Sequence, residues 1–165
     1  MLRRMSLARV EIDAPGLAGA SEARRLEWDA IVREMTTPGE MTLRQGTETL
    51  RVTVTQQAVH VSLEDGGGVS LVDAEVPQKR LGGLVTDYVD VVREIARSDG
   101  QGIARFEALD MAKKVTHDKA ARFLQASLPG FGLDHPSARR LFTLLMALKV
   151  DTTRLVGVHG HRRVR

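Results

Sequence analysis

The sequence predicts an α+β fold in which an antiparallel β-meander of three to four strands is covered by about four to five helices. Two observations lead to this class. Apolar residues alternate with polar ones between residues 41 and 76, and they recur at helical spacing through most of the C-terminal half. A third observation sets the size. A chain of 165 residues, 42% of them hydrophobic, builds one core without disulfides or metals, so we expect a single domain over residues 1–155.

The first elements are predicted to be a short strand and a helix. Ala8, Val10 and Ile12 alternate with charged residues, as in a half-buried strand. Ser21 is placed to cap a helix in which apolar residues recur at helical spacing up to the Thr-Thr-Pro-Gly sequence at residues 36–39. We therefore expect one strand and one helix before the meander.

The meander is predicted from period-two alternation in three segments. Apolar residues occupy every second position over residues 50–54 and 59–63, and the pattern resumes at Val69. The glycine run at residues 66–68 precedes a strand and lacks the Lys-Ser/Thr pair of a phosphate-binding loop. These glycines therefore indicate a hairpin turn.

Three helices are predicted in the C-terminal half. One begins near Pro77 and stops at residues 98–100. The second runs from about residue 103 to residue 128, with an interruption or a bend near residues 116–118, where side chains with local capping ability cluster. Asp134 can cap the last helix, whose apolar residues cover almost its full circumference. We expect this last helix to lie at the centre of the core.

The charge distribution separates a nearly neutral body from a basic C-terminal end. The chain has 24 Lys and Arg against 21 Asp and Glu, but five basic residues and one acidic residue lie at or after Lys149, leaving 19 basic and 20 acidic residues before it. We expect residues 156–165 to form a flexible basic tail in which Arg162, Arg163 and Arg165 contact polyanions. Because the body is not basic, a nucleic-acid partner is less favoured than a protein partner.

The composition also excludes several kinds of chemistry. The chain contains no cysteine, which rules out disulfides, thiolate metal ligands and a cysteine nucleophile. No apolar signal-peptide region follows Arg3 and Arg4, and no apolar stretch approaches the roughly 20 residues that cross a bilayer. We expect a cytoplasmic protein without a membrane partner, a cofactor or a metal.

Two groups of side chains suggest a functional site. His117, Asp118 and Asp110 could bring an imidazole beside two carboxylates, as in a general-base or metal site; the alternative is a helix break capped by local polar side chains. Arg139 and Arg140 lie in the first turn of the last helix, where the helix dipole disfavours cations. Both groups therefore require an explanation from the fold or from a ligand.

The two arginines require a compensating negative charge. We expect them to pair with Asp87, Glu107 or Asp110; the alternative is an acidic partner or a phosphate group outside the fold. The candidate interaction or ion-pair cluster consists of Asp87, Glu107, Asp110, His117, Arg139 and Arg140.

The same residues carry a resemblance to a known family. Asp87-Tyr88, Glu107-Ala108-Leu109-Asp110-Met111, His117-Asp118 and the run over residues 138–144 occur in the order and spacing of the UPF0262 signature. This family consists of small uncharacterised bacterial proteins, and the chain resembles a divergent member of it. The resemblance implies an α+β fold and a cytoplasmic bacterial protein, and it brings no established activity.

Three classes of function remain open. No set of nucleophile, base and orienting group can be assembled from the sequence, and an aromatic content of 4% argues against a base-stacking surface. We therefore expect a non-enzymatic protein-binding module that regulates or inhibits a partner protein. The alternatives are a nucleic-acid-associated protein that uses the basic C-terminal tail, and a small ligand-binding or hydrolase-like protein around Asp110, His117 and Arg139.

Overall fold

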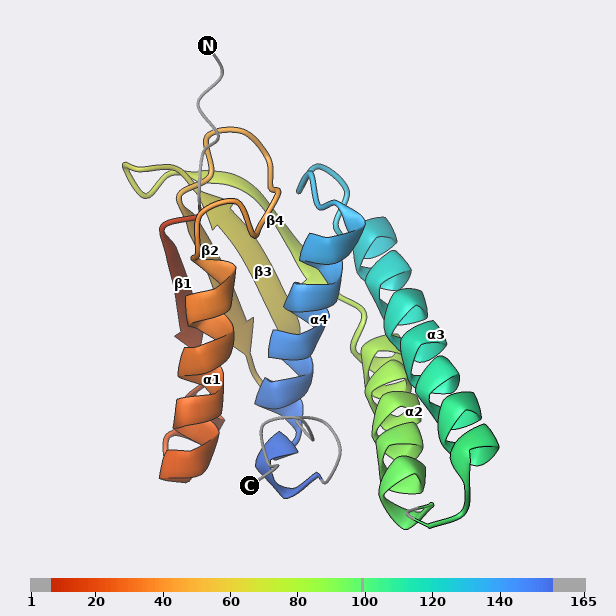
Figure 1. Ribbon diagram of the computed structural model, residues 1–165. Helices are drawn as coiled ribbons and strands as arrows, with labels where there is room; N and C mark the ends of the chain where they lie inside the picture. Colours follow the sequence, from red (N-terminus) through yellow and green to blue (C-terminus); the bar gives the residue numbers. More distant parts are fainter. Residues whose placement is uncertain (1–6, 99, 156–165) are drawn as a thin grey trace.

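A four-stranded sheet forms one layer of the protein (Figure 1). The computed structural model describes residues 7–98 and 100–155. In this part of the chain the strands are β1 (Arg9–Asp13), β2 (Thr49–Val54), β3 (Val59–Glu64) and β4 (Ser70–Val76), arranged in the order β1-β2-β3-β4. The pairs β2–β3 and β3–β4 are antiparallel, so the meander predicted from the alternation is confirmed.

The first strand, β1, adds a parallel pair to this antiparallel meander. β1 pairs parallel with β2, and the register places Val10 opposite Leu50 and Ile12 opposite Val52. The direction has a topological cause, because helix α1 (Glu22–Met35) lies between the two strands in the chain and returns it to the end at which β1 began. The sheet is therefore mixed: alternation predicts that a strand forms but does not set its direction.

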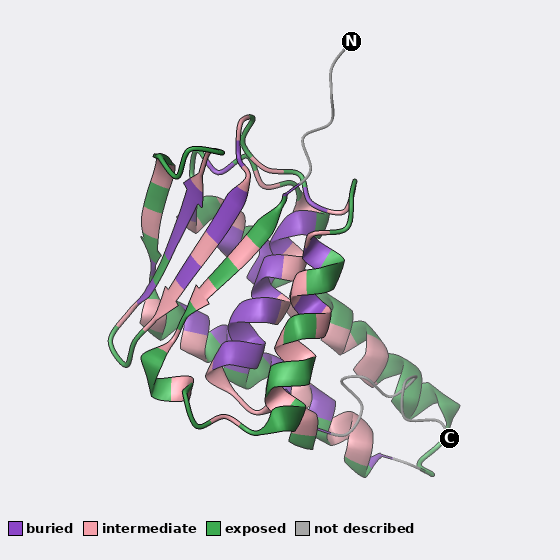
Figure 2. Cartoon of the chain, turned by 90° about the vertical axis from the view of Figure 1, so that its left-hand side faces the viewer, coloured by how far each residue is buried: buried purple, intermediate pink, exposed green. Residues whose placement is uncertain are grey.

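The helices lie on one side of the sheet. After the meander come α2 (Gln78–Arg97), α3 (Ile103–Ser127) and α4 (His135–Lys149), and short 3-10 turns occur at Pro15–Leu17 and Thr152–Arg154. Figure 2 shows the helices on a common side of the sheet, and in Figure 1 α2 and α3 lie side by side on the side of α4 that faces away from α1. The predicted α+β class is confirmed. Among residues 7–98 and 100–155, no helix has the length and apolar character needed to span a membrane.

Helix α4 occupies the centre of the core. Nine of its fifteen residues are buried, and it contacts α1 and α3. Leu141, Leu145, Leu148 and Phe142 are each at most 2% exposed. A helix with apolar residues around most of its circumference needs cover on several sides, which explains why the predicted central position is confirmed.

Side chains of α1 close the C-terminal end of α4. Nε1 of Trp28 and Nη2 of Arg24 each donate a hydrogen bond of 3.0 Å to the main-chain oxygen of Ala147. This carbonyl lies in the last turn of α4, where no further helical N–H is present to satisfy it. The two bonds therefore fix α1 against the last helix.

The predicted caps are present at both helices for which they were expected. The hydroxyl of Ser21 accepts the N–H of Arg24 at 3.2 Å at the start of α1. At the start of α4, a carboxylate oxygen of Asp134 accepts the N–H of Ser137 at 2.9 Å. Each cap satisfies a main-chain donor that has no partner within its helix.

The glycine run between β3 and β4 forms a hairpin turn, as predicted. The carboxylate of Asp65 accepts the N–H groups of Gly67 and Val69, at 2.9 Å and 3.0 Å. Gly68 has a φ of 80°, a conformation that glycine adopts without steric cost. The Asp65 side chain thus satisfies two main-chain donors of the turn.

Helix α3 is continuous, which corrects the prediction of an interruption near residues 116–118. All residues from Ile103 to Ser127 are helical. The hydroxyl of Thr116 donates to the main-chain oxygen of Ala112 at 2.8 Å, so it bonds along the helix instead of ending it. The next two side chains, His117 and Asp118, are bonded to α4 rather than to their own main chain.

Candidate functional site

Most of the side chains named in the sequence analysis meet where the middle of α3 crosses the second turn of α4. His117 and Asp118 come from α3, and Arg139 and Arg140 come from α4. A surface groove of about 480 Å³ passes over this junction. Its lining consists of Glu34, His117, His135, Pro136, Arg139, Arg140 and Thr143.

His117 lies among aromatic side chains. Its ring centre is 5.5 Å from that of Tyr88 on α2 and 5.7 Å from that of Phe142 on α4. Burial lowers the pKa of His117 to about 4, so the imidazole is neutral at pH 7. Burial likewise raises the pKa of Tyr88 to about 12, which keeps the phenol neutral. The contact between α2, α3 and α4 is thus an uncharged aromatic cluster.

The hydrogen bonds of His117 define its tautomer. Nε2 lies 3.1 Å from the main-chain oxygen of Arg139, which can only accept, so Nε2 carries the hydrogen and donates it. The hydroxyl of Thr143 donates to the same oxygen at 3.1 Å. Because Nε2 already carries a hydrogen, this atom cannot take a proton from Thr143, which lies 3.4 Å away. The imidazole therefore acts as a donor that joins α3 to α4.

Asp118 forms the charged part of the same junction. One carboxylate oxygen accepts Nε2–H of His135 at 3.0 Å and also accepts Nη1–H of Arg139. The hydrogen bond from His135, followed by that from Arg139, lowers the pKa of Asp118 against the opposing effect of desolvation. The carboxylate is thus ionised at pH 7 and compensates the cation of Arg139 in the second turn of α4.

Arg140 is bound on the opposite flank of α4. Nη2 lies 2.7 Å from a carboxylate oxygen of Glu40, and Nη1 donates to the main-chain oxygen of Glu40 at 2.9 Å. A further contact of 3.4 Å joins Nε to the carboxylate of Glu34 in α1. Both arginines therefore have acidic partners inside the fold, one on each side of the helix.

These partners are not Asp87, Glu107 or Asp110, so the predicted pairing of the two arginines with those acids is wrong. Asp110 lies 3.3 Å from Lys114 on its own helix, and Asp87 and Glu107 are exposed. The physical reason is the continuity of α3, which places Asp118, two turns beyond Asp110, level with Arg139. The adjacent His117-Asp118 pair was the available sequence signal. For Glu34 and Glu40 the sequence held none, because they lie about 100 residues before Arg140.

The described residues hold no group of three or more His, Asp and Glu side chains able to bind a metal ion. The tail arginines Arg162, Arg163 and Arg165 lie outside the described residues, so their predicted contact with polyanions is untested. Within the junction, the charged groups compensate one another and the imidazole is neutral. The ion pairs of Arg139 and Arg140 thus attach α4 to the rest of the fold on both of its sides.

A second surface lies on the outer side of α3. Met111 is 60% exposed and Val115 is 57% exposed, and Ala104 and Ala108 are exposed on the same side of the helix. We call Ala104, Ala108, Met111 and Val115 the α3 strip. The opposite side of α3 carries the buried residues Ala120, Ala121 and Leu124 further along the helix. Helix α3 therefore has apolar residues both toward the core and toward solvent.

The structure defines a class of protein: a small α+β domain with a mixed sheet covered on one side and a last helix braced by ion pairs on both flanks. A family model described as an uncharacterised protein family, UPF0262, matches residues 4–151. The chain belongs to this family, which confirms the resemblance noted in the sequence.

Relatives share modest identity with the chain. A UPF0262 protein of Jannaschia sp. (strain CCS1) is 27% identical over 157 residues, which cover 87% of this chain and 97% of the relative. A UPF0262 protein of Paracoccus denitrificans (strain Pd 1222) is 41% identical over 66 residues, 39% of this chain and 37% of the relative. One of Phenylobacterium zucineum (strain HLK1) is 38% identical over 68 residues, 40% of this chain and 43% of the relative. No solved structure matches the chain.

Proposed function

We propose that this protein is a cytosolic, non-enzymatic protein-binding module and that the α3 strip is its binding surface. The observation that carries the proposal is the exposure of two large apolar side chains on one side of a well-formed helix, Met111 at 60% and Val115 at 57%. In this role the protein regulates or inhibits its partner by covering the surface to which it binds.

The alignment of these residues is what distinguishes them from ordinary exposed apolar side chains. Single exposed apolar residues are normal on soluble proteins, but a helix that is apolar on its outer side usually has a partner there. On α3, the two alanines extend the apolar surface of Met111 and Val115 toward the N-terminal end of the helix. Covering this strip removes apolar area from water, which favours association.

The junction of α3 and α4 also supports the proposal, because its polar side chains are used in contacts between the two helices. His117 is neutral and donates to a main-chain oxygen, and the Asp118 carboxylate is bonded to two side chains of α4. Groups used in this way hold helices together. His117, Asp118 and Arg139 thus join α3 to α4, whereas the α3 strip makes no such contact between the helices of the described chain.

A photo-cross-linking experiment in cells tests the proposal. A photoreactive phenylalanine analogue is placed at Met111 in one variant and at Glu75, an exposed residue of β4, in the control variant. The expected result is a protein adduct from position 111 and none from position 75. Adduct masses identify what is bound.

Other adducts would favour the other functions. A nucleic-acid adduct, lost on deletion of residues 156–165, would support a role for the basic tail and overturn the proposal. A small molecule that copurifies with the original protein, but not with the Arg139→Ala variant, would support ligand binding at the junction. Equal labelling from positions 75 and 111 would show that the α3 strip has no special affinity.

A further inference from the structure

The residues of the α3 strip are spaced like the seam of a coiled coil. Ala104, Ala108, Met111 and Val115 follow one another at intervals of four, three and four residues, the a/d pattern of heptads. At 100° per residue they lie within about 60° around the helix axis. A seam of this kind is complementary to another helix with the same spacing.

We propose that the α3 strip binds the α3 helix of a second copy of this chain, with the two helices antiparallel. This inference rests on one part of the proposed function, that the α3 strip is a binding surface, and names a second copy as its occupant. When the crossing is centred between Leu109 and Asp110, Ala104 faces the partner's Val115 and Ala108 faces the partner's Met111. Each small side chain then meets a large one, so the seam fills without a gap.

Charges beside the strip favour the same arrangement. Glu107 and Lys114 flank the strip on one side, and both side chains are exposed. In the antiparallel pair, Glu107 lies beside the partner's Lys114, and the two-fold axis generates this contact twice. In the single chain, Lys114 contacts Asp110 at 3.3 Å, but its side chain is 62% exposed. Such an exposed ion pair contributes little free energy, so Lys114 can pair with the partner's Glu107 instead.

A parallel pair of the same helices is disfavoured. In parallel coiled coils a residue in the position of Lys114 contacts the residue five positions further along the other helix, which here is the partner's Lys119. Two lysines would therefore face each other on both sides of the seam. The large residues would also be opposite copies of themselves, with alanine opposite alanine. The sequence of α3 thus selects the antiparallel direction.

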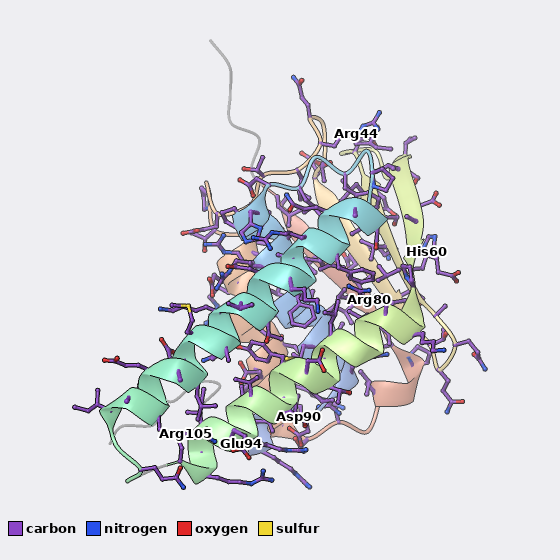
Figure 3. The ribbon with its side chains drawn as sticks, turned by 90° about the vertical axis from the view of Figure 1, so that its right-hand side faces the viewer. Arg44, His60, Arg80, Asp90, Glu94 and Arg105 are labelled. Atoms are coloured by element: carbon purple, nitrogen blue, oxygen red, sulfur yellow. The ribbon has the colours of Figure 1, made fainter. Side chains whose placement is uncertain are left out.

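The position of α3 leaves the strip accessible. Figure 3 shows α2 and α3 at the front of the molecule when it is viewed from the side away from α1. The first turn of α3 is held by an ion pair of 3.1 Å between Arg105 and Glu94 of α2, both labelled in that view. Arg105 therefore contacts α2 from a different side of α3 than the strip.

The size of the seam sets the expected affinity. Four residues of each helix make the contact, and interfaces of this extent are small and associate weakly. We expect a dimer with a dissociation constant on the order of micromolar, which forms at high protein concentration and separates on dilution.

Charge reversal tests the pairing. Sedimentation equilibrium of the full chain gives the dimer dissociation constant for the original sequence and for Glu107→Lys, Lys114→Glu and the double variant. Each single reversal should weaken association about tenfold, because two attractive contacts become repulsive. The double variant restores opposite charges and should recover to within about threefold. Equal melting temperatures for all four proteins establish that the monomer fold is unchanged.

Disulfide formation tests the direction of the helices. The chain has no cysteine, so Ala108→Cys and Met111→Cys variants can be mixed and oxidised without competing thiols. Antiparallel helices favour the mixed disulfide. Ala104→Cys alone should not cross-link, because the two copies of residue 104 are about 16 Å apart along the axis, whereas a disulfide needs Cα atoms within about 7 Å.

The possible outcomes separate this inference from the proposed function. A chain that stays monomeric at about millimolar concentration, a failed charge rescue or cross-linking of Ala104→Cys with itself would overturn the antiparallel dimer. If position 111 then labels a different protein in cells, the proposed function stands with another partner. Adducts to a second copy alone would support the dimer and refute the role as regulator of another protein.

Discussion

Arg139 and Asp118 form an ion pair that joins the second turn of α4 to the middle of α3. A cation at the start of a helix is unfavourable because the helix dipole is positive there, and the carboxylate of Asp118 supplies the compensating charge. His135, in the first turn of α4, donates to the same carboxylate oxygen. This one acid therefore holds two side chains of α4 and sets how the two helices meet.

Replacing either member of this ion pair should destabilise the protein moderately. About a third of each side chain is exposed, 36% for Arg139 and 34% for Asp118, so solvent weakens the interaction. We expect Asp118→Ala to lower the melting temperature by about 3 °C. Because the two residues act on each other, the double variant with Arg139→Ala should lose less than the sum of the two single changes. Thermal unfolding followed by circular dichroism measures all three.

Asp110 provides the matched control for that cycle. It lies on the same helix as Asp118 and was the partner suggested by the sequence, but its carboxylate lies near Lys114. Asp110→Ala should therefore change the melting temperature little, and its effect should simply add to that of Arg139→Ala. Additive behaviour of Asp118→Ala with Arg139→Ala would contradict the ion pair.

Acid should weaken the fold through His117. The pKa of this side chain is about 4 in the folded protein and 6.5 in the unfolded chain, so the unfolded state binds the proton first as the pH falls. Stability is thus lost between pH 6.5 and pH 4. After allowance for partial exposure, the loss is on the order of 2 kcal/mol. Urea unfolding at a series of pH values measures it.

The His117→Gln variant isolates the contribution of His117. Glutamine does not titrate, and its amide can donate to the main-chain oxygen of Arg139. The difference in unfolding free energy between the two proteins should therefore shrink as the pH is lowered from 6.5 to 4. An NMR titration that finds the His117 pKa near 6.5 would contradict the buried, neutral imidazole.

Most of the secondary structure could be predicted because it depends on neighbours in the chain. The caps at Ser21 and Asp134 and the alternation in the meander act over two to four residues, and the structure confirms them. The direction of β1 could not be predicted in this way. It depends on where α1 returns the chain, and alternation contains no information about that.

The candidate site could be predicted only in part, because only some of its determinants are local in the chain. The sequence located the two arginines and showed that they need acids, because the helix dipole acts locally. Which acids they bind depends on how helices distant in sequence pack together. Arg140 reaches Glu40 across 100 residues, and Asp118 comes level with Arg139 because α3 continues through the predicted break.

The central position of α4 makes its apolar side chains the most costly to shorten. Leu145 is fully buried, so Leu145→Ala removes buried surface and leaves a cavity, which should cost about 2 to 5 kcal/mol. Leu26 on α1 is 61% exposed and provides the control, since Leu26→Ala should change stability by less than about 0.5 kcal/mol. Urea unfolding gives both values, and similar losses for the two variants would show that α4 is not central.

The cap of α4 should contribute separately from the ion pairs behind it. The carboxylate of Asp134 accepts the N–H of Ser137 at 2.9 Å, and alanine at this position would leave that donor without its partner. Asp134→Ala should therefore cost about 1 kcal/mol in urea unfolding, whereas Asp134→Asn keeps an oxygen acceptor and should retain most of the stability. Equal losses for both variants would mean that the negative charge, rather than the hydrogen bond, stabilises the start of the helix. Since the Asp118 pair lies one turn further along, its coupling to Arg139 should persist in the Asp134→Asn background.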